Sequence, residues 1–295
     1  MNGLLVIDKP AGMTSHDVVA RLRRITGERS IGHLGTLDPM ATGVLPLLLG
    51  KFTRLAQYFS SAEKSYSGTI RFGFATDTYD AEGKPDGPDL WPLHPPLTLE
   101  RVRSAAARFH GEMEQMPPPY SAKKIAGTPA YKLARAGKPV ELKAARVCIA
   151  SFEIVALEGA GATFAMSISA GGYVRSVAHE LGRDLGCGAH LSALRRTQAG
   201  AFTLAEAHTL AEVEPLAGDL EALGALCAHP RSLLPEMPSV TGDAITLGRL
   251  RNGAQANLPE FSRAPLVKVY ASQRELVGIA KRVAGTLFQP VVVMG

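Results

Sequence analysis

Residues 44–49, Val-Leu-Pro-Leu-Leu-Leu, constrain the fold of this 295-residue chain more than any other stretch. An apolar run of this length between two glycines is typical of a buried strand, and it is far shorter than the roughly 20 residues that cross a bilayer. A glycine-rich turn precedes it and contains a single carboxylate, Asp38. The strand is therefore expected to fix Asp38 at the edge of a hydrophobic core.

Asp38 has two interpretations at this point. Asp before Pro39 commonly begins a helix or a turn, because Asp accepts a backbone N–H and proline presets φ. Alternatively, the glycines let the backbone approach a ligand closely, and the buried strand holds the carboxylate in place for that ligand. The remainder of the chain has to decide between the two.

Length and cysteine usage limit the class of protein. A chain of 295 residues favours one large domain and one small one. The three cysteines stand far apart, and Cys187 and His190 have no matching second pair, so we expect neither a disulfide framework nor a metal site. The N-terminus lacks a basic leader and a long apolar segment. We therefore expect a cytoplasmic protein without a membrane span.

A basic stretch indicates a nucleic-acid partner, with a solvated surface as the alternative. The segment from Tyr120 to Arg146 contains one acidic residue, Glu141. Cations release counterions from a sugar-phosphate backbone, and interleaved tyrosines can stack on bases. Arg195 and Arg196 add to the net charge of +5. The basic residues of the stretch are Lys123, Lys124, Lys132, Arg135, Lys138, Lys143 and Arg146.

The order of the expected elements indicates the fold class. The patterns predict strands at 3–9, 65–76, 146–159 and 162–172, and helices at 14–27, 98–111 and 173–186. Because strands and helices mix without strict alternation, we expect an α+β fold with a mixed, largely antiparallel sheet. A linker at 229–240 precedes apolar segments that predict a small all-β module. The expected domains are residues 1–235 and 240–295.

Arg175 conflicts with its local context. It lies in the first turn of the helix predicted at 173–186, where the positive end of the helix dipole disfavours a cation. A nearby carboxylate or phosphate would resolve the conflict, whereas an exposed arginine would simply tolerate it.

Five motifs resemble those of one family. Residues 32–50 resemble the catalytic-aspartate motif of the TruB family, the tRNA pseudouridine-55 synthases. Four more segments are similar to its N-terminal motif, tyrosine motif, RNA-gripping insertion and arginine motif, at residues 4–19, 64–83, 115–142 and 171–202. Order and spacing fit over residues 3–210. The resemblance implies a catalytic domain of pseudouridine-synthase type with an insertion at about 114–146, followed by a β-rich, RNA-binding (PUA-like) module.

The resemblance also implies roles for single residues. Asp38 would be the catalytic carboxylate, Tyr66 would stack on the target uracil, and Arg175 would pair with Asp38. Leu194 would pack against the flipped nucleotide, and Leu34 stands where the family more often has threonine. Further substrate contacts are implied for His33, Asp80 and Tyr173, and a supporting role near the loop for Lys9 and Pro10. From the basic stretch, Lys123, Lys124 and Lys132 are expected to bind the RNA.

The implied reaction turns the uridine at tRNA position 55 into pseudouridine. The C1′–N1 bond breaks, the uracil rotates and C5 rejoins the sugar, so no net redox change occurs and no metal or cofactor is needed. The reaction requires a carboxylate, an extruded base and a closed pocket. Attack on C1′, attack on C6 and abstraction of the ribose 2′ proton all remain open for Asp38. The expected partner is the T-arm stem-loop of tRNA, bound by a monomer.

Two other functions fit the same residues. A tRNA-folding chaperone would grip the T-arm with the same basic surface, and modification would then be secondary. The guide-RNA-dependent relative, which is the catalytic subunit of box H/ACA particles, would carry long basic tails that this sequence lacks.

Overall fold

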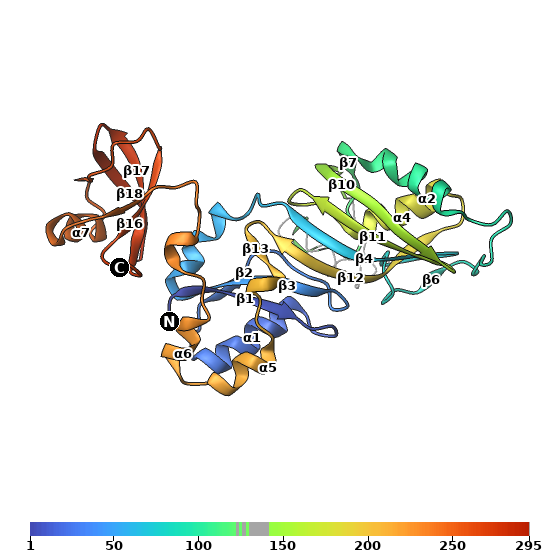
Figure 1. The fold of residues 1–295 in the computed structure, drawn as a ribbon, viewed down its shortest axis with the longest axis horizontal. Coiled ribbons are helices and arrows are strands. Elements are labelled where there is room, and N and C mark those ends of the chain that lie inside the picture. Colours follow the sequence, from blue (N-terminus) through green and yellow to red (C-terminus); the bar gives the residue numbers. More distant parts are fainter. Residues whose placement is uncertain (122–123, 126–127, 130–141, 295) are drawn as a thin grey trace.

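Two sheets follow one another along the long axis of the molecule (Figure 1). The computed structural model describes residues 1–121, 124–125, 128–129 and 142–294. The larger sheet holds the first two thirds of the chain, and the smaller one is built from residues 239–293 at the opposite end. No helix in these described ranges is both long enough and apolar enough to span a membrane.

The larger sheet is mixed and largely antiparallel, which confirms the predicted fold class. Among its described strands, only β12 and β3 pair in parallel. The short strands β2 (Ile31–His33) and β13 (Phe202–Thr203) pair antiparallel with β3 and β12. The strand order is β1 (Gly3–Lys9), β3 (Thr42–Leu49), β12 (Ala189–Ala199), β4 (Lys64–Phe72), β11 (Gly161–Ile168), β10 (Ala145–Glu158) and β7 (Gly111–Gln115).

Strand β3 is the buried strand that the apolar run predicted. Every residue from Gly43 to Leu49 is buried between β1 on one side and β12 on the other. The parallel pairing brings Arg196 of β12 opposite Gly43. A Cβ at Gly43 would lie 2.2 Å from the Arg196 carbonyl oxygen, and its φ is +100°, so only glycine fits there. The loop that carries Asp38 therefore enters the sheet beside Arg196.

The helices cover the sheet as their apolar faces require. Helix α1 (Ser15–Thr26) lies within the predicted helix 14–27; Thr14 caps its start, and Gly27, whose φ is +68°, ends it. Helix α4 (Val174–Asp184) packs on β12, and α2 (Leu99–Ala106) packs on β10. The shorter helices are α5 (Leu210–Val213), α6 (Leu220–Ala225) and 3-10 turns at Gly50–Tyr58, Ala107–Phe109, Leu204–Glu206, Glu214–Leu216 and Pro230–Ser232.

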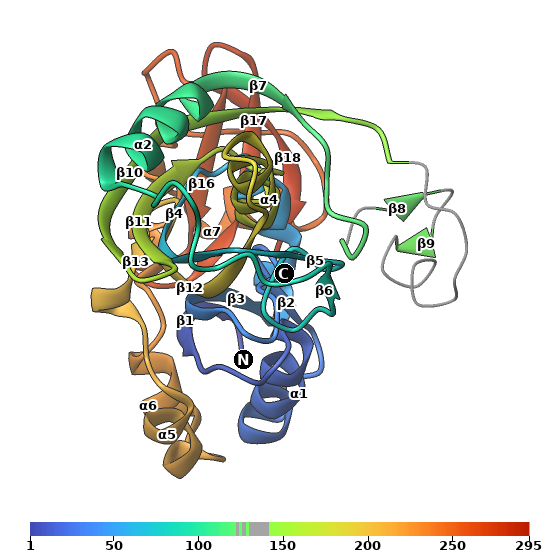
Figure 2. The same ribbon diagram turned by 90° about the vertical axis from the view of Figure 1, so that its right-hand side faces the viewer.

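Two small hairpins form separate two-stranded sheets. Strands β5 (Ala75–Thr76) and β6 (Pro85–Asp86) enclose the acidic loop that contains Asp80. Strands β8 (Lys124–Ile125) and β9 (Thr128–Pro129) lie well away from the sheet (Figure 2). The first hairpin is part of the site described below.

The C-terminal module is β-rich but not all-β. Its sheet has the order β14 (Ser239–Thr241), β16 (Leu266–Tyr270), β17 (Leu276–Ala284), β18 (Leu287–Val293) and β15 (Ala256–Asn257). The expectation of an all-β module was wrong, because α7 (Ala244–Arg251) buries Leu247 and Leu250 against the module's own core. Leu247 and Leu250 have helical spacing, but the helix has only eight residues and its Ile245 is 80% exposed, so the apolar face is poorly defined in the sequence.

The predicted linker is firmly packed. Leu233, Leu234 and Met237 are buried in a cluster that also contains Val44 of β3 and Ile279 of β17. Burial of such side chains contributes about 1.5–3 kcal/mol each. The segment between the two sheets is therefore anchored to both of them.

We expect Leu47→Ala to lower the free energy of unfolding by about 2–5 kcal/mol, because Leu47 is fully buried in β3 and its truncation leaves a cavity. The measurement is urea denaturation followed by circular dichroism. Leu220→Ala is the matched control, since Leu220 is 53% exposed and its truncation should cost within about 0.5 kcal/mol. Equal losses for both variants would mean that β3 is not central to the core.

Candidate functional site

Arg175 and Asp38 form a two-point ion pair. Arg175 Nε lies 3.0 Å from Asp38 Oδ2, and its Nη2 donates to Asp38 Oδ1 at 3.1 Å. The arginine is the second residue of α4, as expected, and is 5% exposed. The predicted pairing is therefore present, and it resolves the conflict between this cation and the helix dipole. Residues 38–41 form a turn closed by Ala41 N–H on the Asp38 carbonyl, without a helix.

Asp80 contacts the same guanidinium from another side. Its Oδ2 lies 3.4 Å from Arg175 Nη1, and its side chain is only 4% exposed. Thr78 Oγ1 donates to Asp80 Oδ1 at 2.6 Å, and the Thr78 carbonyl accepts from Arg175 Nη1 at 3.0 Å. Tyr79 between them has a φ of +65° and stacks on His179 with ring centroids 3.8 Å apart. The loop from the β5–β6 hairpin is thus locked onto the arginine.

The electrostatics of Asp38 reflect two opposed effects. Burial raises the pKa of Asp38 above its ordinary value, the Arg175 guanidinium lowers it, and the nearby Asp80 carboxylate raises it again. The two hydrogen bonds from Arg175 favour the ionised form. The Asp38 carboxylate remains one third exposed, whereas the side chains of Arg175 and Asp80 are buried. Of these three side chains, Asp38 is thus the one that a ligand can reach.

A cavity of about 230 Å³ opens at Asp38. Tyr66 and Lys64 come from one face of β4, and further along the same face Ile70 and Phe72 are buried in the core. Leu194 and Arg196 come from β12, the neighbouring strand. The remaining lining residues are Gly35, Thr36, Leu37, Gly171, Gly172, Tyr173, Val174 and Arg175. The predicted residues Asp38, Tyr66, Tyr173, Arg175 and Leu194 thus share one cavity.

The start of α4 also anchors the first residues of the insertion. Gln115 exchanges hydrogen bonds with the backbone of Tyr173, at 2.8 and 3.1 Å. Ser176 Oγ donates to the Met116 carbonyl at 2.8 Å, and Arg175 Nη2 donates to the Tyr120 carbonyl at 2.9 Å. Hydrogen bonds therefore join the cavity wall at the start of α4 to residues 115, 116 and 120.

Two predicted site residues, His33 and Asp80, do not line the cavity. His33 lies in β2 and does not line the cavity; its Nδ1 is buried without a hydrogen bond, and burial lowers the pKa of His33. Asp80 reaches the cavity only through Arg175. Lys123 and Lys132, and the side chain of Lys124, lie outside the described residues.

Lys9 supports the loop, as the resemblance implied. Its ammonium is buried and donates to the carbonyls of Pro10, Met13 and Pro39 at 2.8, 2.5 and 3.2 Å. Burial lowers the pKa of Lys9 from 10.5 to about 8, while the Asp38 carboxylate opposes this fall. The residue after Asp38 is thereby tied to β1.

Arg196 is the site residue that the sequence analysis missed. It was counted with Arg195 as part of a basic surface, yet only Arg195 is exposed, and Arg195 pairs with Asp8 at 2.7 Å. Arg196 is 1% exposed and lines the cavity. The available signal was strand alternation, because Arg196 stands two residues after Leu194 and so shares its inward face.

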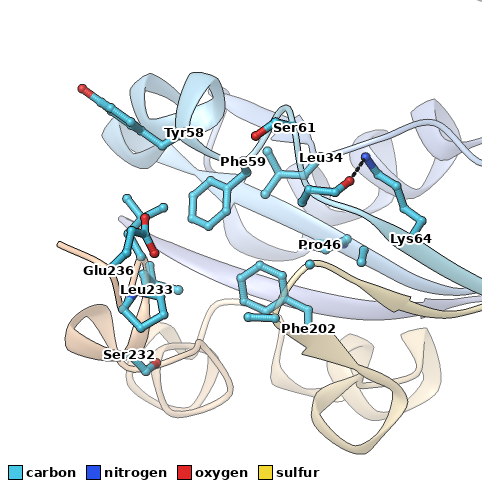
Figure 3. Close-up of a pocket in the computed structure, with 16 residues that line it drawn as sticks. Leu34, Pro46, Tyr58, Phe59, Ser61, Lys64, Phe202, Ser232, Leu233 and Glu236 are labelled. Carbon is cyan, nitrogen blue, oxygen red and sulfur yellow. Dashed lines mark hydrogen bonds between the residues drawn. The ribbon is translucent and has the colours of Figure 1, made fainter. Parts of the chain in front are cut away.

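A second, mostly apolar cavity of about 310 Å³ lies beyond Lys64, where the linker meets the larger sheet. Phe59 and Phe202 face each other across it with ring centroids 5.9 Å apart (Figure 3). Lys64 lines both cavities and donates to the Ala62 carbonyl at 2.5 Å. Among the described residues, no buried ion pair lines this cavity, whereas the Arg175–Asp38 pair lines the smaller one. Within the part of the chain described, no three His, Cys, Asp or Glu residues are grouped to hold a metal ion.

The sequence of this chain is similar to those of known proteins. Residues 23–174 match the TruB family pseudouridylate synthase (N terminal domain), and residues 175–226 match the tRNA pseudouridylate synthase B C-terminal domain. The protein named tRNA pseudouridine synthase B from Solibacter usitatus is 44% identical over 297 residues, covering 100% of both chains. Its namesake from Opitutus terrae is 48% identical over 216 residues, covering 73% of this chain and 88% of its own.

Solved structures share the fold. A chain from a Cbf5–Nop10–Gar1 complex superposes with a TM-score of 0.69 at 26% identity, covering 96% of this chain and 79% of that one. A chain from an H/ACA RNP bound to a substrate RNA gives a TM-score of 0.70 at 24% identity, covering 99% and 85%. The latter likeness extends over the whole fold.

We expect Arg175→Gln to raise the pKa of Asp38 further, because a lost cation favours the neutral carboxyl. Carbon-13 NMR of labelled aspartate carboxyls, assigned with Asp38→Asn, measures the change. Arg108→Gln is the control, since Arg108 pairs with Asp184 at the surface and should leave Asp38 unaffected. An unchanged Asp38 pKa in Arg175→Gln would contradict the electrostatic role of the pair.

Proposed function

Because this chain belongs to the TruB family of pseudouridylate synthases, we propose that it isomerises uridine to pseudouridine in tRNA. The target is the uridine at position 55 of the T-loop, Asp38 is the catalytic carboxylate, and the base is flipped into the cavity that Asp38 lines. The protein acts as a monomer in the cytoplasm. Residues 1–235 form the catalytic domain, and residues 240–295 contribute to RNA binding.

The observation that carries this proposal is the partly exposed Asp38 carboxylate, which is paired with the buried Arg175. Asp38 is one third exposed toward a cavity, while its two hydrogen bonds to Arg175 hold it in one orientation. A reactive carboxylate must be both accessible and fixed, because catalysis depends on near-attack geometry. Arg175 itself is fixed by the Thr78 and Tyr120 carbonyls and by Asp80, so the whole group is preorganised.

The walls of the cavity suit a detached uracil. The base must leave C1′, turn, and rejoin through C5 without escaping, so the site has to be closed and has to hold a flat ring. The Tyr66 ring supplies a flat face, and Leu194 supplies an apolar one. Polar groups converge from Asp38 and Arg175. These residues support the roles that we assign to them: Tyr66 stacks on the uracil, and Leu194 packs against the flipped nucleotide.

The choice of tRNA rests on the relatives, which are named tRNA pseudouridine synthase B. A-form stems hide their base edges in a deep groove, so a flipped base is most accessible in a folded loop. Lys123, Lys124 and Lys132 would grip the backbone of that loop, and Tyr173 and His33 would hold its shape. Asp80 would act near the base by orienting Arg175. The chemistry uses neither a metal nor a cofactor.

Two alternatives have less support. A tRNA chaperone would need the basic surface but not an accessible carboxylate held by a buried arginine. A guide-RNA-dependent enzyme has the same fold, and one of the structural neighbours comes from an H/ACA RNP. Both alternatives are tested by asking whether the purified chain alone modifies tRNA.

We predict that Asp38→Asn abolishes turnover while RNA affinity remains nearly intact, because phosphate contacts carry most of the binding. Pseudouridine is mapped in an unmodified tRNA transcript by carbodiimide-dependent reverse-transcription stops, and affinity is measured by filter binding. Asp184→Asn, at a surface ion pair, should retain full activity. Multiple turnover by Asp38→Asn would overturn the assignment. A wild-type chain that binds tRNA but never modifies it would favour the chaperone.

A T-arm hairpin alone should be a sufficient substrate, because the cavity receives one nucleotide from a preformed loop. Single-turnover rates with the hairpin and with full-length tRNA are compared directly. Similar rates would support recognition of the loop. A hairpin that binds without being modified, while the full tRNA is modified, would show that recognition extends over the whole tRNA.

A further inference from the structure

Given the proposed function, we propose that Arg196 is a positioning residue for the reaction: its guanidinium ties the loop that carries Asp38 to the hydroxyl of Tyr66, and so sets the carboxylate and the ring relative to each other. The inference concerns a residue that contacts neither Asp38 nor an acidic partner. It explains why a full charge is buried in the floor of the cavity.

The burial of Arg196 is costly. The residue is 1% exposed, and no carboxylate in the described ranges lies within ion-pair distance of its guanidinium. An apolar side chain of similar size often serves stability as well or better than a buried charge does. Core packing therefore does not explain why Arg196 is buried. The hydrogen bonds that its guanidinium donates offer an explanation.

Arg196 binds the loop on both sides of Asp38. Its Nε donates to the Val44 carbonyl at 2.7 Å, and its Nη2 donates to the Gly35 carbonyl at 3.0 Å. Gly35 has a φ of +108°, and a Cβ there would lie 3.4 Å from Arg196 Nη1, so the loop lies directly against the guanidinium. One side chain thus fixes the beginning and the end of the segment that carries Asp38.

The same guanidinium reaches Tyr66. Arg196 of β12 and Tyr66 of β4 are direct cross-strand partners in the antiparallel register, so their side chains leave the sheet side by side. The positive charge of Arg196 opposes the rise that burial causes in the pKa of Tyr66. The Tyr66 ring and the loop that carries Asp38 therefore both lie against the Arg196 guanidinium.

This arrangement predicts an effect on chemistry more than on binding. Asp38 and Tyr66 come from separate segments of the chain, and the reaction needs both at fixed positions about one base. A displacement of about 1 Å can cost about 100-fold in rate. Loss of the shared cation would let the loop and the ring move independently, while the phosphate contacts that hold RNA would remain.

The test uses Arg196→Lys, which keeps the charge but loses the forked geometry, and Arg196→Met, which removes the charge. Arg103→Lys is the matched control, because Arg103 also donates to two backbone carbonyls, those of Ile154 and Val155, but does not line the cavity. Circular dichroism and thermal melting establish that each variant folds. Single-turnover rates and Kd for tRNA are then measured in the wild-type and Tyr66→Phe backgrounds.

We expect Arg196→Lys to lower the single-turnover rate by about 100-fold with little change in Kd, and Arg103→Lys to leave both unchanged. Because Arg196 acts partly through the Tyr66 hydroxyl, its substitution should cost less in the Tyr66→Phe background. A full rate for Arg196→Lys, or equal losses in both backgrounds, would overturn the proposal.

A second readout needs no activity. Ultraviolet difference spectroscopy, with Tyr66→Phe as the reference, follows ionisation of the Tyr66 phenol. The Tyr66 pKa should rise in Arg196→Met, because the cation that stabilises phenolate is gone. An unchanged Tyr66 pKa would contradict the contact itself. A wild-type chain without synthase activity would refute the proposed function and leave this measurement valid.

Discussion

The site depends on one constraint: Arg175, almost completely buried at the start of α4, holds two carboxylates and two backbone carbonyls at once. Breaking such a group by removing one partner leaves an uncompensated buried charge, which costs far more than an exposed ion pair contributes. The cation therefore fixes the Asp38 loop, the β5–β6 loop and the first residues of the insertion relative to α4. Three segments that are distant in sequence meet at one residue.

Buried cations bound to carbonyls repeat this principle at the floor of the cavity. Lys9 binds the carbonyl of Pro39, and Arg196 binds those of Gly35 and Val44. Each loses hydration on burial and recovers hydrogen bonds from a loop that would otherwise present unsatisfied carbonyls. Of these two cations, Lys9 also favours the ionised form of the Asp38 carboxylate. Stability and chemistry therefore depend on the same contacts, so substitutions here should affect both.

Much of the local structure could be predicted because it follows from short-range chemistry. The helix predicted at 14–27 and the buried strand behind Asp38 each depend on a few neighbouring residues. The pairing of Arg175 with Asp38 was inferred from a conflict with the helix dipole and from the resemblance. Arg196 was missed because it was counted with Arg195 as a basic surface; strand alternation places it on the inward face with Leu194, but the β3 partner that covers it is distant in sequence. Helix α7 was missed because it is only eight residues long and its exposed Ile245 obscures the apolar face formed by Leu247 and Leu250.

The central claim is that the target uridine enters the smaller cavity beside Asp38. The most direct measurement is a crystal structure of Asp38→Asn bound to a T-arm hairpin, because this variant should bind without reacting. The account predicts a flipped uracil against Tyr66 and Leu194, with the ribose C1′ next to residue 38. A target base that remains stacked in the RNA, or that occupies the apolar cavity between Phe59 and Phe202, would contradict it.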